Sequence, residues 1–345
     1  MSWEEEAIQK VKSAEKLYKK GLKTKKKKCS EKIESAGKLY TQAGHDYVRA
    51  ELGGKAAECF IKGATIITEA GGPMAAQNAA ENYLEAGNIL IESEPEKGIE
   101  YIEKTISLYV QRDQRARAAK QLEKIAKVCE QKLDDKRKAM KCLEQASQLF
   151  KDDKSPSTAN TCILNAANLA VEISDFESGL KHFSQVANFT SQSKLLQFGS
   201  NAYYMKAVLC ALAIDFVRAK NVIHELTAES EFEDSREFVF CSKVIRFVEK
   251  RKLQMYKTRV KKFEEFSIMD EQTKTLLKRI EQNIIGDSND EGGELRIDND
   301  RDIDDSLEDT TRDSSAVEAL TEHHGLEKKQ ETVNRKISFD EDDLF

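Results

Sequence analysis

Proline is nearly absent from this sequence: only three prolines occur in 345 residues. Because proline breaks the interior of a helix, this shortage leaves long helices uninterrupted. Aromatic residues are also scarce, at 7% of the chain, whereas the good helix formers Ala, Glu, Lys, Leu and Gln dominate. The composition argues against a strand-rich fold and predicts an all-α protein.

Features that mark membrane-spanning and secreted proteins are missing as well. No run of about 18 apolar residues occurs, so no transmembrane helix is predicted. The acidic start Met1–Glu6 lacks the apolar region of a secretory signal. The seven cysteines are scattered and form no C-x-x-C pair, which disfavours a disulfide framework or a zinc site. We expect a cytoplasmic protein whose reduced cysteines pack as small hydrophobic side chains.

Sequence motifs that carry catalysis are also lacking. The chain has no P-loop, no nucleophile elbow and no spacing of histidines, cysteines and carboxylates typical of metal ligands. The interpretation is therefore a protein that is not an enzyme and that uses no cofactor.

The net charge of −6 hides an asymmetry along the chain. Residues 286–345 hold 20 acidic and 7 basic side chains, a net charge of −13, which leaves +7 on the other 285 residues. In the same segment Asp, Glu, Ser, Thr and Asn dominate and the hydrophobic periodicity stops. We expect 286–345 to be a disordered acidic tail. A basic body is expected to bind acidic partners.

A repeat is the strongest signal that the sequence does contain. Small and apolar residues recur at offsets of 0, +3, +7 and +10, which trace one face of an α-helix. Residues such as Phe60, Tyr83 and Leu122 are expected to form the core, and the small first residue lets a neighbouring helix approach. A weaker copy begins at Ile99. The stronger copies begin at Ala57, Ala80, Ala119, Ala139 and Ala159.

The spacing of these copies predicts the architecture. Copies begin roughly 20 residues apart, so two helices make a unit of about 40, as in TPR-like helix-hairpin solenoids. Breaks are predicted at Gly53-Gly54, Gly71-Gly72-Pro73, Glu94-Pro95 and Ser155-Pro156. We expect about 14 helices: a repeat array over 1–192, a C-terminal helical bundle over 193–285, and the tail. The bundle should include a buried helix from Ala202 to Phe216 and a last helix from Asp270 to Ile285.

Several segments, taken in order, resemble one family. They are Asn82–Asn88, Ala118-Ala119-Lys120, Tyr203–Ala219, Asp234–Glu237 and Met269–Ile284. Together they resemble the SNAP adaptors, the soluble NSF attachment proteins, and within them the alpha branch. The resemblance covers roughly residues 5–296. It implies a right-handed stack of helices.

The resemblance also implies a function. Such adaptors lie along an assembled SNARE bundle of the syntaxin type, which has an acidic surface, and recruit the NSF-type AAA ATPase that pulls the bundle apart. They serve vesicle fusion and ER–Golgi protein transport. A rival interpretation is a TPR-type peptide-binding scaffold or co-chaperone, although such arrays have a 34-residue period rather than one near 40.

Candidate residues for SNARE binding follow from the family pattern. Lys120 matches a family position that contacts the bundle, and Arg112, Arg115 and Arg117 lie beside it in the sequence. Two other family lysines are replaced here by Thr161 and Asn165, and Lys151, with Lys154, is expected to compensate. The alternative is that these are ordinary exposed charges, because exposed ion pairs contribute little singly.

The basic run Lys19–Lys28 is expected between the first two helices. In the family this loop contacts the membrane through phenylalanines, which are missing here. Leu22 and Tyr18 are the apolar candidates, and attraction to anionic lipid is expected from Lys23, Lys25, Lys26, Lys27 and Lys28. The alternative is a solvated charge run. Nucleic-acid binding is not expected, because no aromatic residues are interleaved with the lysines.

The carboxyl end offers two candidates for ATPase stimulation. Family members end in a short acidic stretch with a penultimate leucine. The true terminus, with Asp342, Asp343 and Leu344, keeps this chain-end position. Leu295 keeps the family spacing from the last helix instead. The sequence favours Leu344 and leaves Leu295 open.

Overall fold

The structure is a computed structural model that describes residues 2–23, 26–193, 196–229 and 231–290. Within these ranges all the regular structure is helical, as the composition predicts. The prediction that the disordered tail begins at residue 286 was wrong, because residues 286–290 belong to the last helix. The rest of the predicted tail, residues 291–345, lies outside the described residues. The α-helices are α1 (Trp3–Leu22), α2 (Lys26–Arg49), α3 (Gly53–Ala70), α4 (Ala75–Ser93), α5 (Pro95–Gln111), α6 (Arg115–Gln131), α7 (Lys136–Asp152), α8 (Pro156–Glu172), α9 (Phe176–Ser191), α10 (Ser200–Ile214), α11 (Phe216–Glu229), α12 (Arg236–Glu249), α13 (Leu253–Phe266) and α14 (Glu271–Asp290).

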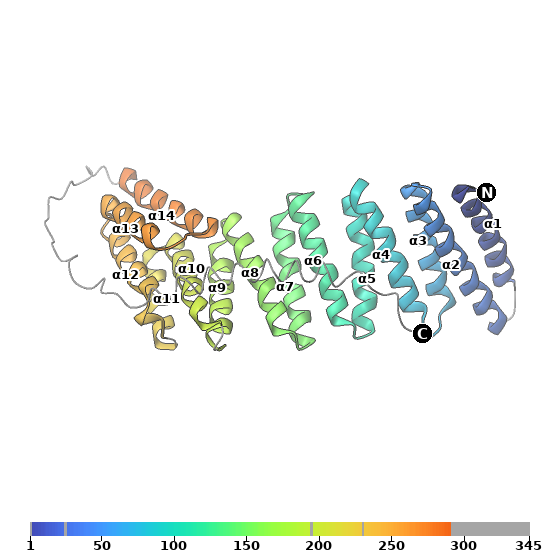
Figure 1. Ribbon diagram of the computed structural model, residues 1–345, viewed down its shortest axis with the longest axis horizontal. Coiled ribbons are helices and arrows are strands. Elements are labelled where there is room, and N and C mark those ends of the chain that lie inside the picture. The colour runs from blue at the N-terminus through green and yellow to red at the C-terminus, as the bar shows by residue number, and fades with distance from the viewer. Residues whose placement is uncertain (1, 24–25, 194–195, 230, 291–345) are drawn as a thin grey trace, which may run out of the picture. The chain divides into compact units, whose positions relative to one another are not determined.

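Successive helices from α1 to α11 pack against each other as antiparallel hairpins (Figure 1). The breaks predicted from glycine and proline are confirmed, because α3 begins at Gly53, Gly71 follows α3, and α5 and α8 begin at prolines. The described residues up to Gly286 form one compact unit. A domain boundary at 192/193 stays a prediction.

Contacts between alternate helices show that the hairpins stack in two layers. In one layer, α2, α4, α6 and α8 touch in turn: Asn82 donates to Thr41 at 2.9 Å, Lys124 donates to Asn88 at 2.6 Å, and the thiol of Cys162 donates to Glu123 at 3.5 Å. In the other layer, Lys55 of α3 pairs with Glu4 of α1, and His182 of α9 pairs with Glu144 of α7, both at 2.8 Å. We call these the even layer and the odd layer.

These contacts between alternate helices also confirm the repeat length. The Asn82–Thr41 and Lys124–Asn88 bonds join residues 41 and 36 positions apart, and the His182–Glu144 bond spans 38 positions. Since each bond connects equivalent helices of adjacent hairpins, the period is near 40, as the sequence pattern predicts.

Small residues stand where neighbouring helices approach most closely. The first residues of the repeat copies, Ala57, Ala80, Ala119, Ala139 and Ala159, are all fully or almost fully buried. Glycines mark the crossing of α4 and α5, where one backbone lies close to the other. A Cβ atom placed on Gly98 would lie 2.7 Å from the backbone nitrogen of Ile91 and 2.9 Å from the carbonyl oxygen of Gly87.

One type of turn recurs at the connections between helices, and the sequence pattern does not predict it. Six non-glycine residues adopt positive φ just after a helix: Glu51, Asp113, Asp134, Lys154, Ser174 and Arg251. In five of these turns the next residue donates its N–H to the carbonyl five positions earlier, as Ser155 does to Phe150 at 2.8 Å. This bond satisfies an otherwise unpaired carbonyl at the helix end.

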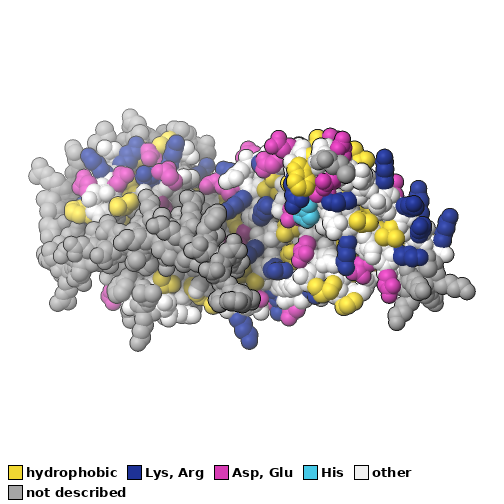
Figure 2. All heavy atoms as spheres, turned by 45° about the vertical axis from the view of Figure 1, so that its right-hand side comes forward, with side chains coloured by type: hydrophobic (Ala, Val, Ile, Leu, Met, Phe, Trp, Pro, Cys, Tyr) yellow, Lys and Arg dark blue, Asp and Glu magenta, His cyan; other side chains and the backbone are white. Residues whose placement is uncertain are grey.

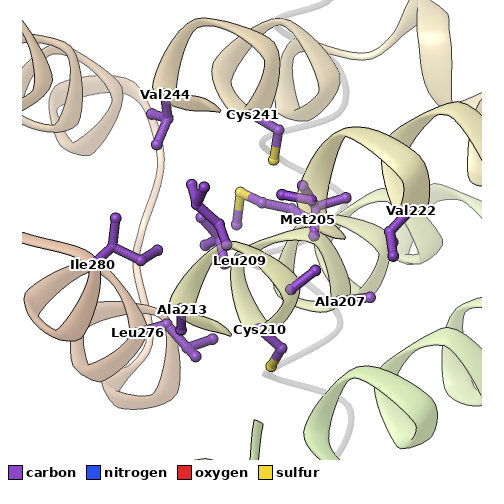
Figure 3. Close-up of a cluster of buried hydrophobic side chains, with 14 of the residues drawn as sticks. Met205, Ala207, Leu209, Cys210, Ala213, Val222, Cys241, Val244, Leu276 and Ile280 are labelled. Atoms are coloured by element: carbon purple, nitrogen blue, oxygen red, sulfur yellow. The ribbon is translucent and has the colours of Figure 1, made fainter. Parts of the chain in front are cut away.

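The C-terminal bundle is built around α10. Eleven residues of this helix are buried, so apolar side chains line it on every side. Figure 3 shows Met205, Leu209 and Ala213 of α10 among Cys241 and Val244 of α12 and Leu276 and Ile280 of α14. The hydroxyl of Tyr256 on α13 donates to the carbonyl oxygen of Leu277 at 2.7 Å, which fixes α13 to α14.

Two helix ends differ from the sequence expectation. The buried helix stops at Ile214 rather than Phe216, because Asp215 is extended and its carboxylate accepts the N–H of Arg218 at 2.8 Å, which starts α11. The last helix continues past Ile285 to Asp290. Gly286 lowers helix stability without removing a backbone hydrogen bond, so it does not end the helix.

The α4–α5 crossing generates a stability prediction. We expect Gly98→Ala to lower the free energy of unfolding by about 1–3 kcal/mol, because its Cβ overlaps backbone atoms that cannot move aside. Gly54→Ala is the matched control, since a Cβ there meets nothing within 4 Å. Chemical denaturation of both variants measures the difference. Equal stability of the two variants would contradict the close-packing account.

Candidate functional site

Turns that lead from an odd-numbered helix to the next even-numbered one lie along one edge of the stack, because successive helices are antiparallel. The guanidinium of Arg112, after α5, donates to the carbonyl oxygen of Pro73, after α3, at 3.1 Å and ties two of these turns together. Lys23, of the residues expected near the membrane, and Arg112, Arg115 and Lys151, of those expected at the SNARE surface, lie on or near this edge. We call it the basic edge.

The structure changes the expected form of the lysine run. Lys19 and Lys20 belong to the last turn of α1, and α2 already begins at Lys26. The prediction that the whole run is a loop was therefore wrong. Lysine is a good helix former, and cations in the last turn of a helix are stabilised by its dipole.

Two residues of the α1–α2 connection are exposed. The side chain of Leu22 is 60% exposed, and Lys23 is exposed as well. Tyr18 is held differently: its hydroxyl donates to Glu69 of α3 at 2.7 Å, a bond that raises the Tyr18 pKa. The side chains of Lys25, Lys26, Lys27 and Lys28 lie outside the described part of the chain.

The three arginines expected beside Lys120 are each engaged within the chain. Arg112 bonds Pro73, as above, and its Nε is buried without a hydrogen-bond partner among the described residues. Arg115 pairs with Asp113 at 2.9 Å, and the Arg117 guanidinium lies 5.8 Å from the centre of the Tyr109 ring. Arg112 therefore contributes to the packing of the turns, and it is the least available of the three.

Lys120 is exposed on the outer face of α6. Helical spacing places Arg117, Lys124 and Lys127 on the same face, opposite the buried Ala118, Leu122 and Ile125. We call Arg117, Lys120, Lys124 and Lys127 the α6 stripe. Lys124 and Lys127 were not among the residues predicted from the sequence, although their offsets of +4 and +7 from Lys120 place them on the same helix face.

Neighbouring helices of the even layer carry different charges. The outer face of α4 exposes Glu81, Glu85 and Glu92, and Glu92 pairs with Lys132 at 2.7 Å. On α8, Thr161 and Asn165 are exposed and uncharged. Lys151 is exposed in the last turn of α7, in the odd layer, next to the turn that leads to α8. The structure thus puts Lys151 at the basic edge rather than on the α6 stripe.

The N-terminal end of the molecule is the most basic part of the visible surface. Figure 2 shows Lys and Arg side chains gathered at the end that carries the first helices, whereas basic and acidic side chains are mixed elsewhere. Within the described residues, no group of His, Cys, Asp and Glu is arranged to hold a metal ion. The same part of the chain contains no helix that is long and apolar enough to cross a membrane.

The cysteines are free, and six of the seven are buried. Burial raises the pKa of Cys59 and of Cys142 to about 11. Burial and the nearby Glu123 carboxylate raise the pKa of Cys162 to about 12. Since the thiolate is the nucleophilic form, these thiols are unreactive at neutral pH and act as small core side chains.

Comparison with known proteins identifies the family. The model of the family described as "Soluble NSF attachment protein, SNAP" matches residues 5–285. This chain belongs to the SNAP family.

Individual SNAP-family relatives are moderately similar. The alpha-soluble NSF attachment protein of Mus musculus is 29% identical over 262 residues, which are 76% of this chain and 88% of the mouse protein. The protein of the same name from Saccharomyces cerevisiae is 27% identical over 266 residues, covering 74% and 87% of the two chains. A probable vesicular-fusion protein sec17 homolog from Neurospora crassa is 26% identical over 255 residues, covering 73% and 87%.

Solved structures add little to the family match. The assembly chaperone of RpL4, Acl4, is 14% identical, covers 72% of this chain and 98% of its own, and superposes with a TM-score of 0.33. The SNAP family match ends at residue 285, so Leu295, Asp342, Asp343 and Leu344 lie beyond it as well as outside the described residues.

Proposed function

We propose that this chain is a cytoplasmic, peripherally membrane-associated adaptor that binds assembled SNARE complexes, recruits an NSF-type ATPase and stimulates SNARE disassembly. Membership of the SNAP family over residues 5–285 is the observation that carries the proposal. Relatives named soluble NSF attachment proteins and vesicular-fusion proteins support a role in vesicle fusion and SNARE-related transport. Proteins of this family are adaptors, and we propose that this chain likewise has no catalytic activity.

The α6 stripe is the surface that we assign to the SNARE bundle. Lys120 and Lys127 are exposed, and Lys124 reaches Asn88 of α4 while remaining partly exposed. A row of cations along one helix complements an elongated acidic bundle, and such complementarity speeds association and fixes orientation. Arg115 and Lys151 at the basic edge are proposed as secondary contacts, and Arg112 as a support for the turns.

Lys120→Glu is expected to weaken binding to an assembled SNARE bundle by about threefold to tenfold, because it replaces an attraction by a repulsion at an exposed position. Lys141→Glu is the matched control, since Lys141 is an exposed lysine on α7 in the other layer. Titration of a labelled bundle measures the effect, and circular dichroism checks that both variants fold. If Lys120→Glu binds as well as the control, Lys120 is not part of the site.

The lysines around the α1–α2 connection are proposed to contact anionic membranes. Replacement of Lys25 to Lys28 by alanine should lower binding to phosphatidylserine vesicles at least tenfold, since each lysine near such a surface contributes about 1 kcal/mol. The matched control replaces four basic residues at the α12–α13 turn, Arg246, Lys250, Arg251 and Lys252. The difference should shrink at high salt. Equal vesicle binding of the two variants would make the α1–α2 run an ordinary solvated run of charge.

ATPase stimulation is the decisive test of the proposed function. With the cognate ATPase and a SNARE bundle, the wild-type chain should raise the ATPase rate and disassemble the bundle. We expect Leu344→Ala to abolish stimulation while SNARE binding is kept, and Leu295→Ala to have little effect. The reverse result would move the stimulating leucine to position 295. If the wild-type chain neither binds SNAREs nor stimulates the ATPase, the proposed function is wrong.

A further inference from the structure

A histidine occupies a core position of the repeat in α9. The repeat pattern continues in this helix, with the small residue Gly179 at its first position and Val186 at offset +7, both buried. The residue at offset +3 is His182, which is only 3% exposed. Six earlier copies hold other residue types at this offset: Phe60, Tyr83, Ile102, Leu122, Cys142 and Cys162. In α9 the core position is therefore taken by an imidazole, which titrates near neutral pH.

One nitrogen of the imidazole is hydrogen-bonded and the other is not. The Nε2 atom of His182 lies 2.8 Å from Oε1 of Glu144 on α7. Because an ionised carboxylate only accepts hydrogen bonds, the neutral ring carries its hydrogen on Nε2 and has a lone pair on Nδ1. The Nδ1 atom is buried and has no hydrogen-bond partner among the described residues.

Burial decides how the ring titrates. Removal from water lowers the pKa of His182, and the positive charge of Lys181 lowers it further. Attraction to Glu144 and to Asp175 raises the pKa but does not compensate for the burial. The ring is therefore neutral at neutral pH, and it binds a proton less readily than a histidine in water.

The other helices packed against α9 bring no further free charge to the ring. The one charged residue of α8 is Glu172, which is paired with Lys136 at 2.8 Å. The one charged residue of α10 is Lys206, which is paired with Asp270. Burial raises the pKa of the buried thiols on these two helices, so that they stay neutral as well: Cys162 and Cys210.

The bond between His182 and Glu144 joins helices that belong to different hydrophobic clusters. The buried side chains of α7 pack with those of α6 and α8 in the middle of the array. In contrast, α9 contributes Phe176, Leu180 and Phe183 to the cluster that is built around α10. His182 therefore lies where the repeat array meets the C-terminal bundle.

A second proton on the ring is costly in this place. It binds at Nδ1, since Nε2 already carries a hydrogen. The Nδ1–H group is then a buried donor without an acceptor, on a ring that has become a buried charge, and both effects raise the free energy of the folded state. The charged ring reaches water only by leaving the core, which breaks its bond to Glu144.

We propose that His182 and Glu144 form a pH-sensitive joint between the repeat array and the C-terminal bundle, closed while the imidazole is neutral and loosened when it takes up a proton. The joint goes beyond the proposed function, because it is built into the folded chain and needs no partner. Since the pKa of His182 is lower in the folded than in the unfolded chain, unfolding takes up a proton on the acid side. Stability is therefore lost as the pH falls below the ordinary histidine value of 6.5.

Chemical denaturation of the full chain between about pH 5 and pH 8 tests the joint. The folding constant of the wild-type chain should fall more steeply toward acid pH than that of His182→Leu, by up to about tenfold per pH unit, the limit for one proton. Leucine is an apolar residue of the kind found at this offset in Leu122, so the variant should fold. His224→Leu is the matched control, since His224 is exposed on α11 and should leave the pH dependence unchanged.

Hydrogen exchange of backbone amides shows where the loss occurs. In the wild-type chain, α7 and α9 should lose protection at acid pH before α2 does, and His182→Leu should remove this difference. The joint is wrong if both chains respond to pH alike, or if protection falls evenly in all helices. If His182→Leu does not fold, NMR titration of the wild-type rings decides: His182 must titrate below His224, and an equal or higher value overturns the joint.

Discussion

Close approach of helices at small residues is the constraint on which the whole stack depends. The buried alanines that open the repeat copies leave room for neighbouring helices, and Gly87 with Gly98 lets the backbones of α4 and α5 come close. Each helix can therefore bury apolar residues against two neighbours at once, and no large central core is needed. The outward faces of the helices take no part in this packing, so they can carry rows of charged side chains such as the α6 stripe.

The sequence determines the helix positions well, because they follow from local periodicity. The period near 40, the two-layer hairpins and the breaks at glycines and prolines are all readable from spacing. The ends of the helices are harder to predict from the sequence. Non-glycine residues such as Asp113 and Lys154 adopt positive φ at the turns, where only the bond to the preceding helix end compensates the strain. The residue types at these turns do not indicate a positive φ. Asp215 likewise ends a helix within a run whose sequence predicts one continuous apolar helix.

The candidate site was only partly predictable, for a different reason. Exposure of Lys120 follows from its place opposite the buried face of α6, and the same reasoning yields Lys124 and Lys127. Arg112 lies near Lys120 in the sequence and was therefore predicted to bind with it. Its guanidinium instead donates to the carbonyl oxygen of Pro73, 39 positions earlier. It also grouped Lys151 with Lys120, although the two residues belong to different layers. The ion pair between Asp270 and Lys206, which fixes the start of α14, also had no local signature, because the two residues lie 64 positions apart in the chain.

Nearest-neighbour packing has a mechanical consequence. Among the described residues, the extensive contacts between helices from α1 to α9 all join helices that are neighbours in the sequence. A force applied between the two ends is therefore borne in series, so that the extensions of the hairpin interfaces add and the weakest interface yields first. Such an element extends more under a given force than any one of its interfaces does. The bundle around α10, which joins several helices at once, acts as its least extensible end.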